Sequence, residues 1–400
     1  MSEGKEPIRE IYLIVAYRSL YSRNNALSKG MYLRRILKLN FGPKSKVVLS
    51  KESSESAFGG SIATFDNGNI LAACKGKMCM TYSYPSLAFL DEFPINSSFQ
   101  VHTAGKYLLC CDDVITLSTQ DNKLLGSIKL KAKRDFNNGG WNANCRNVRS
   151  HGNYIVFLTA SSAMGLIKLP TTGTIDGYSL ESNSRTFTLT CPSASLVLED
   201  IDILNERIYC LDCTGHVLIV PFKASRLVGN GGEIINTESI VLQGWGSEGN
   251  DLEGFEKRVN VCHTALTANP NFFVSGYAFT NKDHINTVGF ALYNFKNQKV
   301  VSTVDVAVGK EKDDVRKVEA IHHIKNIFHK VSKINLVIAA SVIQYLFLLG
   351  VHPSSHTISL ISTVSVSSWA HNAMVHIPST QSILLANYEG ISSYPIQYNL

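Results

Sequence analysis

Cysteine pairs are the first residues in this chain whose spacing could support chemistry. Cys210 and Cys213 form a Cys-x-x-Cys motif, which zinc sites and redox pairs both use. A structural zinc site needs four ligands, however, and the sequence holds no second Cys-x-x-Cys motif. The nine cysteines are odd in number and lie mostly in apolar segments. We therefore expect buried, reduced thiols of a cytoplasmic or nuclear protein, and no metal or other cofactor.

Histidines form two further groups that could attract a metal ion. His322 and His323 lie near His329, and His352 and His356 flank a Pro-Ser-Ser turn. Neighbouring residues of a strand point to opposite faces, so His322 and His323 are not expected to share a ligand. Metal-binding histidines also need further ligands and supporting hydrogen bonds, so we expect no metal site at either group.

Carboxylates offer the remaining catalytic option. A metal-dependent hydrolase would gather them in one place, and Asp200 and Asp202, two residues apart, would share one face of a strand. The alternative is that these side chains cap turns and accept hydrogen bonds from backbone amides. The sequence has neither a Gly-x-Ser-x-Gly nucleophile motif nor a phosphate-binding loop. We therefore expect no catalytic residues, and the candidates for the hydrolase alternative are Asp112, Asp113, Glu199, Asp200, Asp202 and Asp283.

The elements that position these residues are β-hairpins that recur along the whole chain. Each hairpin is an apolar strand, a tight polar turn and a second alternating strand, and successive turns lie about 52 residues apart. No window shows a convincing helical stripe of apolar residues. Recurrence of this kind is typical of a β-propeller. The hairpins cover residues 70–82, 107–117, 154–169, 207–220, 272–293, 336–350 and 383–397.

We therefore predict an all-β fold, a seven-bladed β-propeller that forms a single domain over residues 1–400. N-terminal strands within residues 8–53 are expected to pair with C-terminal strands in one blade, because this closes the ring and removes two exposed edges. The predicted blades are 56–96, 97–142, 143–190, 191–242, 255–308, 313–365, and 366–400 together with 8–53.

Membrane and nucleic-acid roles are disfavoured by the sequence. Ile334–Val351 is uncharged and just long enough to cross a bilayer, but its β-branched and aromatic residues favour two buried strands. The N-terminus lacks the pattern of a secretory signal. A net charge of +6 over 400 residues is mild, so nucleic acid is a possible but not a favoured partner.

Long insertions between the strands are the candidate interaction sites. They cover residues 133–149, 226–239 and 244–257, and connections of this length are often functional. The last insertion surrounds two aromatic residues with acids, which suits the docking of a partner protein. The predicted partner-binding residues are Trp245, Glu248, Asp251, Glu253 and Phe255, together with Trp141 from the first insertion.

The hairpins resemble those of the WD40-like β-propellers. Residues 211–220 (LDCTGHVLIV) are similar to the Asp-x-x-Gly-x-Val strand pair of such blades, and residues 73–82 and 388–394 are fainter versions. The sequence departs from the family pattern because no Trp-Asp dipeptide ends a blade and Gly215-His216 falls in a turn. The resemblance implies a rigid platform that binds proteins as a subunit of a larger complex. The function that we predict is therefore a non-catalytic scaffold or adaptor. The alternatives are a metal-dependent hydrolase with its site at the central channel, and an accessory RNA-binding subunit.

Overall fold

The computed structural model shows an all-β protein. Among the residues it describes, the only helical element is the short 3-10 turn η1 (Asp66–Gly68), and no helix has the length and apolar character needed to cross a bilayer. The described residues are 39–49, 61–95, 100–111, 114–121, 123–130, 145–159, 163–171, 175–190, 198–204, 207–212, 216–221, 234–236, 238–241, 260–266, 271–280, 285–297, 299–310, 321–328, 335–341, 345–352, 355–366, 371–387 and 390–398.

Every hairpin predicted from the sequence is present. The uncharged segment 334–351 folds as two paired strands, as the β-branched and aromatic residues indicated. In the two-residue turn of the β4–β5 hairpin, glycine supplies a positive φ, which is 60° at Gly76. The seven hairpins are β4–β5, β8–β9, β12–β13, β16–β17, β21–β22, β25–β26 and β29–β30.

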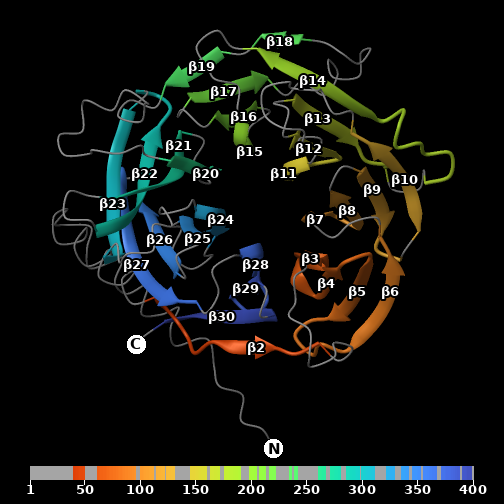
Figure 1. Cartoon of the computed structure of the whole chain (residues 1–400), viewed down its shortest axis with the longest axis horizontal. Coiled ribbons are helices and arrows are strands. Elements are labelled where there is room, and N and C mark those ends of the chain that lie inside the picture. Colours follow the sequence, from red (N-terminus) through yellow and green to blue (C-terminus); the bar gives the residue numbers. More distant parts are fainter. Residues whose placement is uncertain are drawn as a thin grey trace, which may run out of the picture.

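The strands form sheets that are arranged radially around a common centre, so the predicted propeller fold is confirmed (Figure 1). Five of the sheets have four antiparallel strands each. Their strands are β3–β6 (Ser61–Phe65, Ile70–Lys75, Met78–Ser83, Phe89–Pro94), β7–β10 (Gln100–Ala104, Tyr107–Cys111, Val114–Thr119, Leu124–Lys129), β15–β17 with β19 (Leu198–Leu204, Arg207–Asp212, His216–Pro221, Glu238–Val241), β20–β23 (Asn260–Leu266, Phe272–Thr280, Ile285–Asn294, Lys299–Lys310) and β24–β27 (Ile321–Phe328, Asn335–Ser341, Tyr345–His352, Thr357–Ser365).

Two further sheets have five strands each, and both include strands from segments that lie far away in the sequence. In one of them, the short strand β18 pairs in parallel with β14. The following strand, β19, pairs with β17 of the next sheet. Only residue 237 separates β18 from β19. Residues 234–241 therefore join two neighbouring sheets, which the sequence did not predict. This sheet contains β11–β14 (Cys145–His151, Tyr154–Thr159, Ala163–Lys168, Ser184–Thr190) and β18 (Ile234–Asn236).

The second five-stranded sheet brings the two ends of the described chain together. The N-terminal strands β1 and β2 both pair with the C-terminal strand β30, in an antiparallel register that sets Phe41 opposite Ile396 and Val47 opposite Ile391. Leu49, just beyond β2, is almost completely buried. The strands of this sheet are β28–β30 (His371–Ile377, Ser382–Asn387, Gly390–Tyr398), β1 (Leu39–Phe41) and β2 (Ser45–Val47).

The hydrophobic core lies between neighbouring sheets. Each described cluster combines apolar residues of two adjacent sheets, because both faces of a blade are covered by its neighbours. One such cluster joins the sheet of β28–β30 to that of β3–β6 and includes Leu49, Tyr82 and Leu384. Between the sheets of β15–β19 and β20–β23, the rings of Tyr209 and Phe295 stack with centroids 4.9 Å apart.

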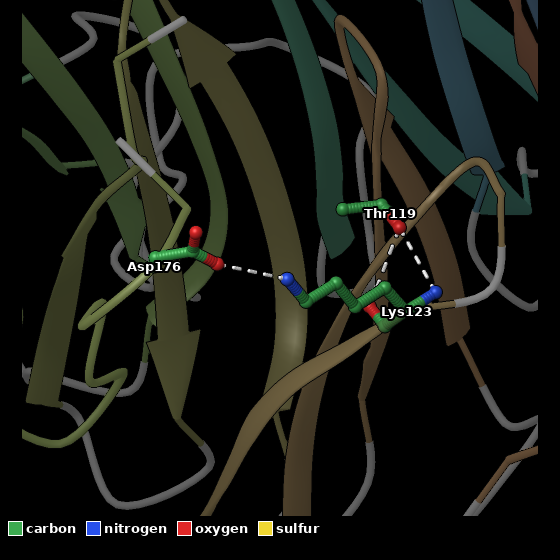
Figure 2. A network of polar contacts seen from close by, with 3 residues as sticks. All are labelled: Thr119, Lys123 and Asp176. Carbon is green, nitrogen blue, oxygen red and sulfur yellow. Dashed lines mark hydrogen bonds and ion pairs between the residues drawn. The ribbon is translucent and has the colours of Figure 1, made fainter. Parts of the chain in front are cut away.

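A segment between β13 and β14, Ile175–Asn183, crosses to the preceding sheet, and we call it the strap. Leu180 of the strap is buried against β10, where a Cβ on Gly126 would lie only 2.9 Å from that of Leu180. Figure 2 shows the polar part of this contact. Lys123 donates a hydrogen bond through Nζ to Asp176 over 3.2 Å, and its backbone amide donates to Thr119 Oγ1 over 2.9 Å.

A candidate interaction face at one end of the propeller

The innermost strands define two faces of the propeller. The first strand of each sheet lies nearest the centre, and the remaining strands follow outward (Figure 1). Four antiparallel strands run alternately between the two ends of the propeller. The fourth strand of a sheet therefore ends on the side where its first strand begins, and the chain enters the next sheet from that side. We call this side the entry face. Connections from the fourth strand of one sheet to the first strand of the next begin and end on it, as do the turns between second and third strands.

Long connections meet the propeller at the entry face. The segments 130–144, 191–197, 242–259 and 311–320 each lead from an outermost strand into β11, β15, β20 or β24. On the opposite face, the turns that join innermost to second strands are shorter, such as 105–106 and 152–153, while segments 169–183 and 222–233, which follow third strands, are long. Because long connections carry most binding residues in rigid scaffolds, the entry face is the stronger candidate for recognition.

The predicted partner-binding residues belong to two of these connections. Trp245, Glu248, Asp251, Glu253 and Phe255 fall between β19 and β20, and Trp141 falls between β10 and β11. All six lie outside the described residues. The strand ends to which the two connections are joined, Lys129, Cys145, Val241 and Asn260, belong to the entry-face ends of their strands.

A β-bulge near the start of the innermost strand occurs in five of the blades. In each case one extra residue interrupts the pairing with the second strand: between Cys145 and Val148, Leu198 and Asp200, Val261 and His263, Ile321 and His323, and His371 and Ala373. Bulges bend a strand and re-aim its side chains, and they are common at barrel rims and next to functional sites. The five bulges therefore interrupt the regular pairing of the innermost strands at their entry-face ends, around the centre of the propeller.

The bulges change how two sequence predictions are read. His322 is the extra residue of the bulge in β24, so the simple alternation used to separate His322 from His323 does not apply there. Asp200 and Asp202, in contrast, follow the bulge of β15 and pair regularly with Leu211 and Tyr209. Their backbone positions are two apart in a regular register, which is the spacing on which the prediction of a shared face rests.

Charged side chains connect two innermost strands. Arg149 of β11 lies with its Nε 3.9 Å from Oδ1 of Asp202 on β15, and both side chains are largely buried. Asp202 Oδ1 also accepts a hydrogen bond from the backbone amide of Ile203 over 2.8 Å. This carboxylate therefore links adjacent blades and orders its own strand, which is the structural role that the sequence left open as an alternative to catalysis.

The other catalytic candidates are not brought together by the described side chains. Asp112, Asp113 and Asp283 fall outside the described residues, in entry-face turns between second and third strands. Among the residues that the structure describes, no group of three or more His, Cys, Asp or Glu side chains could hold a metal ion.

Three residues that the sequence singled out as possible metal ligands, His352, His356 and Cys210, are described by the structure. The ring of His356 stacks on Phe272 of the neighbouring blade with centroids 5.0 Å apart. Burial lowers the pKa of His352, which favours its neutral form inside the protein. Cys210 of the Cys-x-x-Cys motif is completely buried in the core between two blades, and Cys213 lies outside the described residues.

Sequence comparisons do not identify relatives. No protein-family model matches the chain, and no curated protein matches its sequence closely.

Solved structures share the fold. The chain is similar to a crystal structure of RRP9 WD40 repeats, with a TM-score of 0.59 and 12% identity over 89% of this chain and 100% of that one. It is also similar to a structure of U3-55K, with a TM-score of 0.58 and 12% identity over 88% and 100% of the two chains. A chain of the Mitotic Checkpoint Complex matches with a TM-score of 0.55 and 10% identity over 90% and 97%. The resemblance to WD40-like propellers is therefore confirmed at the level of the fold.

Proposed function

We propose that this protein is a non-catalytic interaction scaffold, a subunit of a larger complex that binds protein partners on its entry face. The observation that carries this proposal is that five bulged strand starts and four long connections lie on one face of the propeller. A rigid framework with long connections on one side is the usual arrangement of a protein-binding platform.

We infer that the ring has seven blades in one domain. The five four-stranded sheets supply five of them, and the two five-stranded sheets supply the others. Pairing of β1 and β2 with β30 supports closure between the first and last blades, and the shared core of β28–β30 and β3–β6 supports it further. Closure of this kind removes the exposed edges that an open sheet would present.

The partners that we propose for such a platform are proteins rather than small substrates. Proteins with similar folds include a chain of the Mitotic Checkpoint Complex, which by its name works within an assembly. We place the protein in the cytoplasm or nucleus, since five of its described cysteines are buried and form no disulfide in the structure: Cys74, Cys79, Cys110, Cys111 and Cys210.

The test is affinity purification of the tagged full chain from its own cells, with mass spectrometry of the eluate. Residues 244–257 are replaced by a Gly/Ser segment of equal length, and the matched control replaces residues 224–232, which connect strands on the opposite face. We expect a stoichiometric partner that the first variant loses and the control retains.

Two results would contradict the proposal. One is a protein that purifies alone and carries a stoichiometric metal ion, which would favour the hydrolase alternative. The other is a partner that both variants retain while substitutions on the opposite face remove it, which would place recognition away from the entry face. Binding that falls steeply with salt and depends on added RNA would favour the RNA-binding alternative.

A further inference from the structure

We propose that Cys74 and Cys79 are a reversible oxidation site, at which a hydroperoxide converts two neighbouring thiols into a disulfide, with Cys110 of the adjacent blade as an exchange partner. This inference does not depend on the proposed function.

The two cysteines occupy directly opposite positions of a hairpin. Cys74 of β4 pairs with Cys79 of β5, and the two-residue turn Gly76–Lys77 lies just beyond them. The residues that flank a two-residue turn form a hydrogen-bonded pair, so Cys74 and Cys79, one step further, form a non-hydrogen-bonded pair with Cα atoms about 4.5 Å apart. A disulfide spans Cα separations of about 4.4–6.8 Å. The backbone therefore already has the spacing that a disulfide needs.

The sulfur atoms themselves are in contact. Cys74 Sγ lies 2.6 Å from Cys79 Sγ, and both residues are completely buried. Both are free thiols in the structure. Bond formation requires no movement of the strands, only a small shift of two side chains toward the disulfide length of about 2.05 Å.

A third thiol reaches the pair from the next blade. Cys110 of β8 is buried in the same core cluster as Cys74 and Cys79, between the sheets of β3–β6 and β7–β10, and it contributes to the raised pKa of Cys74. Its sequence neighbour Cys111 packs in a different cluster, with residues of the sheet of β11–β14. Thiol–disulfide exchange could therefore move the bond from Cys74–Cys79 to Cys74–Cys110, which would join two blades covalently.

Burial sets the rate of this chemistry. Burial raises the pKa of the Cys74 thiol well above its usual range, and the hydrogen bonds with Cys110 and Cys79 raise it further. The thiolate is the nucleophile, so little of it forms at neutral pH and oxidation is slow. Because a higher pH increases the thiolate fraction, oxidation is expected to become faster as the pH rises. A completely buried site also admits a small oxidant in preference to a bulky one.

The hydroperoxide is the oxidant that accepts the two electrons released when the disulfide forms. One thiolate attacks a peroxide oxygen, the O–O bond breaks, and a sulfenic acid and hydroxide form, the hydroxide taking up the proton that the thiol released. The second thiol then attacks the sulfenic sulfur, the S–O bond breaks, and a second water leaves as the S–S bond forms. Two thiols lose two electrons and two protons, and hydrogen peroxide gains them to give two waters.

The test uses the intact chain and trypsin. Native protein is treated with hydrogen peroxide, denatured in iodoacetamide to block the remaining thiols, and digested without reductant. Cleavage after Lys51, Lys75, Lys77 and Lys106 separates Cys74 from Cys79, in peptides 52–75 and 78–106. We expect these two peptides to be linked, with a mass two hydrogens below their sum, and to be released by dithiothreitol.

Three variants make the result specific. Cys79→Ser is expected to abolish the 52–75/78–106 species and to favour a link between 52–75 and 107–123, which contains Cys110. Cys110→Ser keeps the first link and abolishes the second. Cys111→Ser leaves both unchanged and serves as the matched control.

The proposal is overturned if wild-type protein shows no 52–75/78–106 link under peroxide that fully oxidises free glutathione. It is also overturned if Cys74 becomes linked equally to the peptide 208–223, which carries Cys210 in a distant blade, because that would indicate random pairing after unfolding.

Discussion

At the scale of single residues, a close contact in the core leaves room only for glycine at position 165. Gly165 of β13 pairs directly with Phe157 of β12, and a Cβ at Gly165 would lie 1.9 Å from Cζ of the Phe157 ring. Phe157 is buried in the core between two blades, so its ring has little space to move aside. The glycine is therefore required by its neighbour rather than by its own backbone angles.

We predict that Gly165→Ala destabilises the fold by about 1–3 kcal/mol, the usual cost of overpacking a core. Chemical denaturation followed by fluorescence measures the change. Gly76→Asn is the matched control, because nothing lies within 4 Å of a Cβ there and asparagine tolerates the positive φ of that turn. Equal stability of the Ala variant and wild type would show that Phe157 repacks freely.

A second prediction concerns the pKa of Tyr178. Burial raises the pKa of Tyr178 to about 12, with a further contribution from nearby Tyr107, and its hydroxyl donates a hydrogen bond to the carbonyl of Lys168 over 2.8 Å. The unfolded pKa is about 10. Because the folded pKa is the higher one, this group stabilises the protein fully below pH 10, and the contribution is lost as the pH rises toward 12.

Near-ultraviolet absorbance checks this prediction. The difference between wild type and Tyr178→Phe should show a phenolate transition near pH 12, and the variant should lose less stability than wild type between pH 10 and 12. A difference transition near pH 10 would mean that the Tyr178 hydroxyl is exposed to solvent.

At the scale of elements, apolar packing rather than surface charge holds the strap to the neighbouring blade. Leu180 is almost completely buried against Gly126 and the core of two blades. The ion pair of Lys123 and Asp176 in the same contact is exposed, so solvent screens it (Figure 2). The two contacts lie in one segment, which allows a direct comparison of their contributions.

Leu180→Ala is therefore expected to lower the free energy of unfolding by about 2–5 kcal/mol, the usual range for a buried leucine. Asp176→Asn should leave the thermal midpoint unchanged, because it removes only an exposed charge. Thermal unfolding of both variants measures the contrast. If Asp176→Asn were as damaging as Leu180→Ala, the strap would be held by its charges.

At the scale of the whole molecule, the N-terminal segment completes the last blade. Val47 and Leu49 are buried in the core that joins the sheets of β28–β30 and β3–β6, while Val48 between them is 66% exposed. This alternation is typical of a strand with one buried face. The segment therefore contributes to the core between the sheets of β28–β30 and β3–β6.

We predict that Leu49→Ala lowers the free energy of unfolding by about 2–5 kcal/mol, because it leaves a cavity in that core. Val48→Ala, one residue away and exposed, should change it by less than about 0.5 kcal/mol. Denaturant unfolding of the full chain compares the two. Equal small effects would indicate that the N-terminal strands do not support the ring.

The hairpins were predictable from the sequence because they are local. Alternating apolar residues and turn glycines such as Gly76 report the second and third strands of each blade without reference to the rest of the chain. The same local patterns separated two strands from a membrane segment at residues 334–351. The resemblance to WD40-like blades rested on these hairpins, and the fold agrees with it.

Tertiary structure alone decided how distant segments meet. Periodicity carries no information on which edge a short strand joins, so the pairing of Ile234–Asn236 with β14 was missed. Bulges such as the one at His322 depend on the register between two strands, and a single strand's sequence does not specify that register. The approach of Cys110 to the Cys74–Cys79 hairpin likewise arises only when two blades pack together. Local residue patterns therefore determined the strands of this protein, and packing between blades decided its faces and its sites.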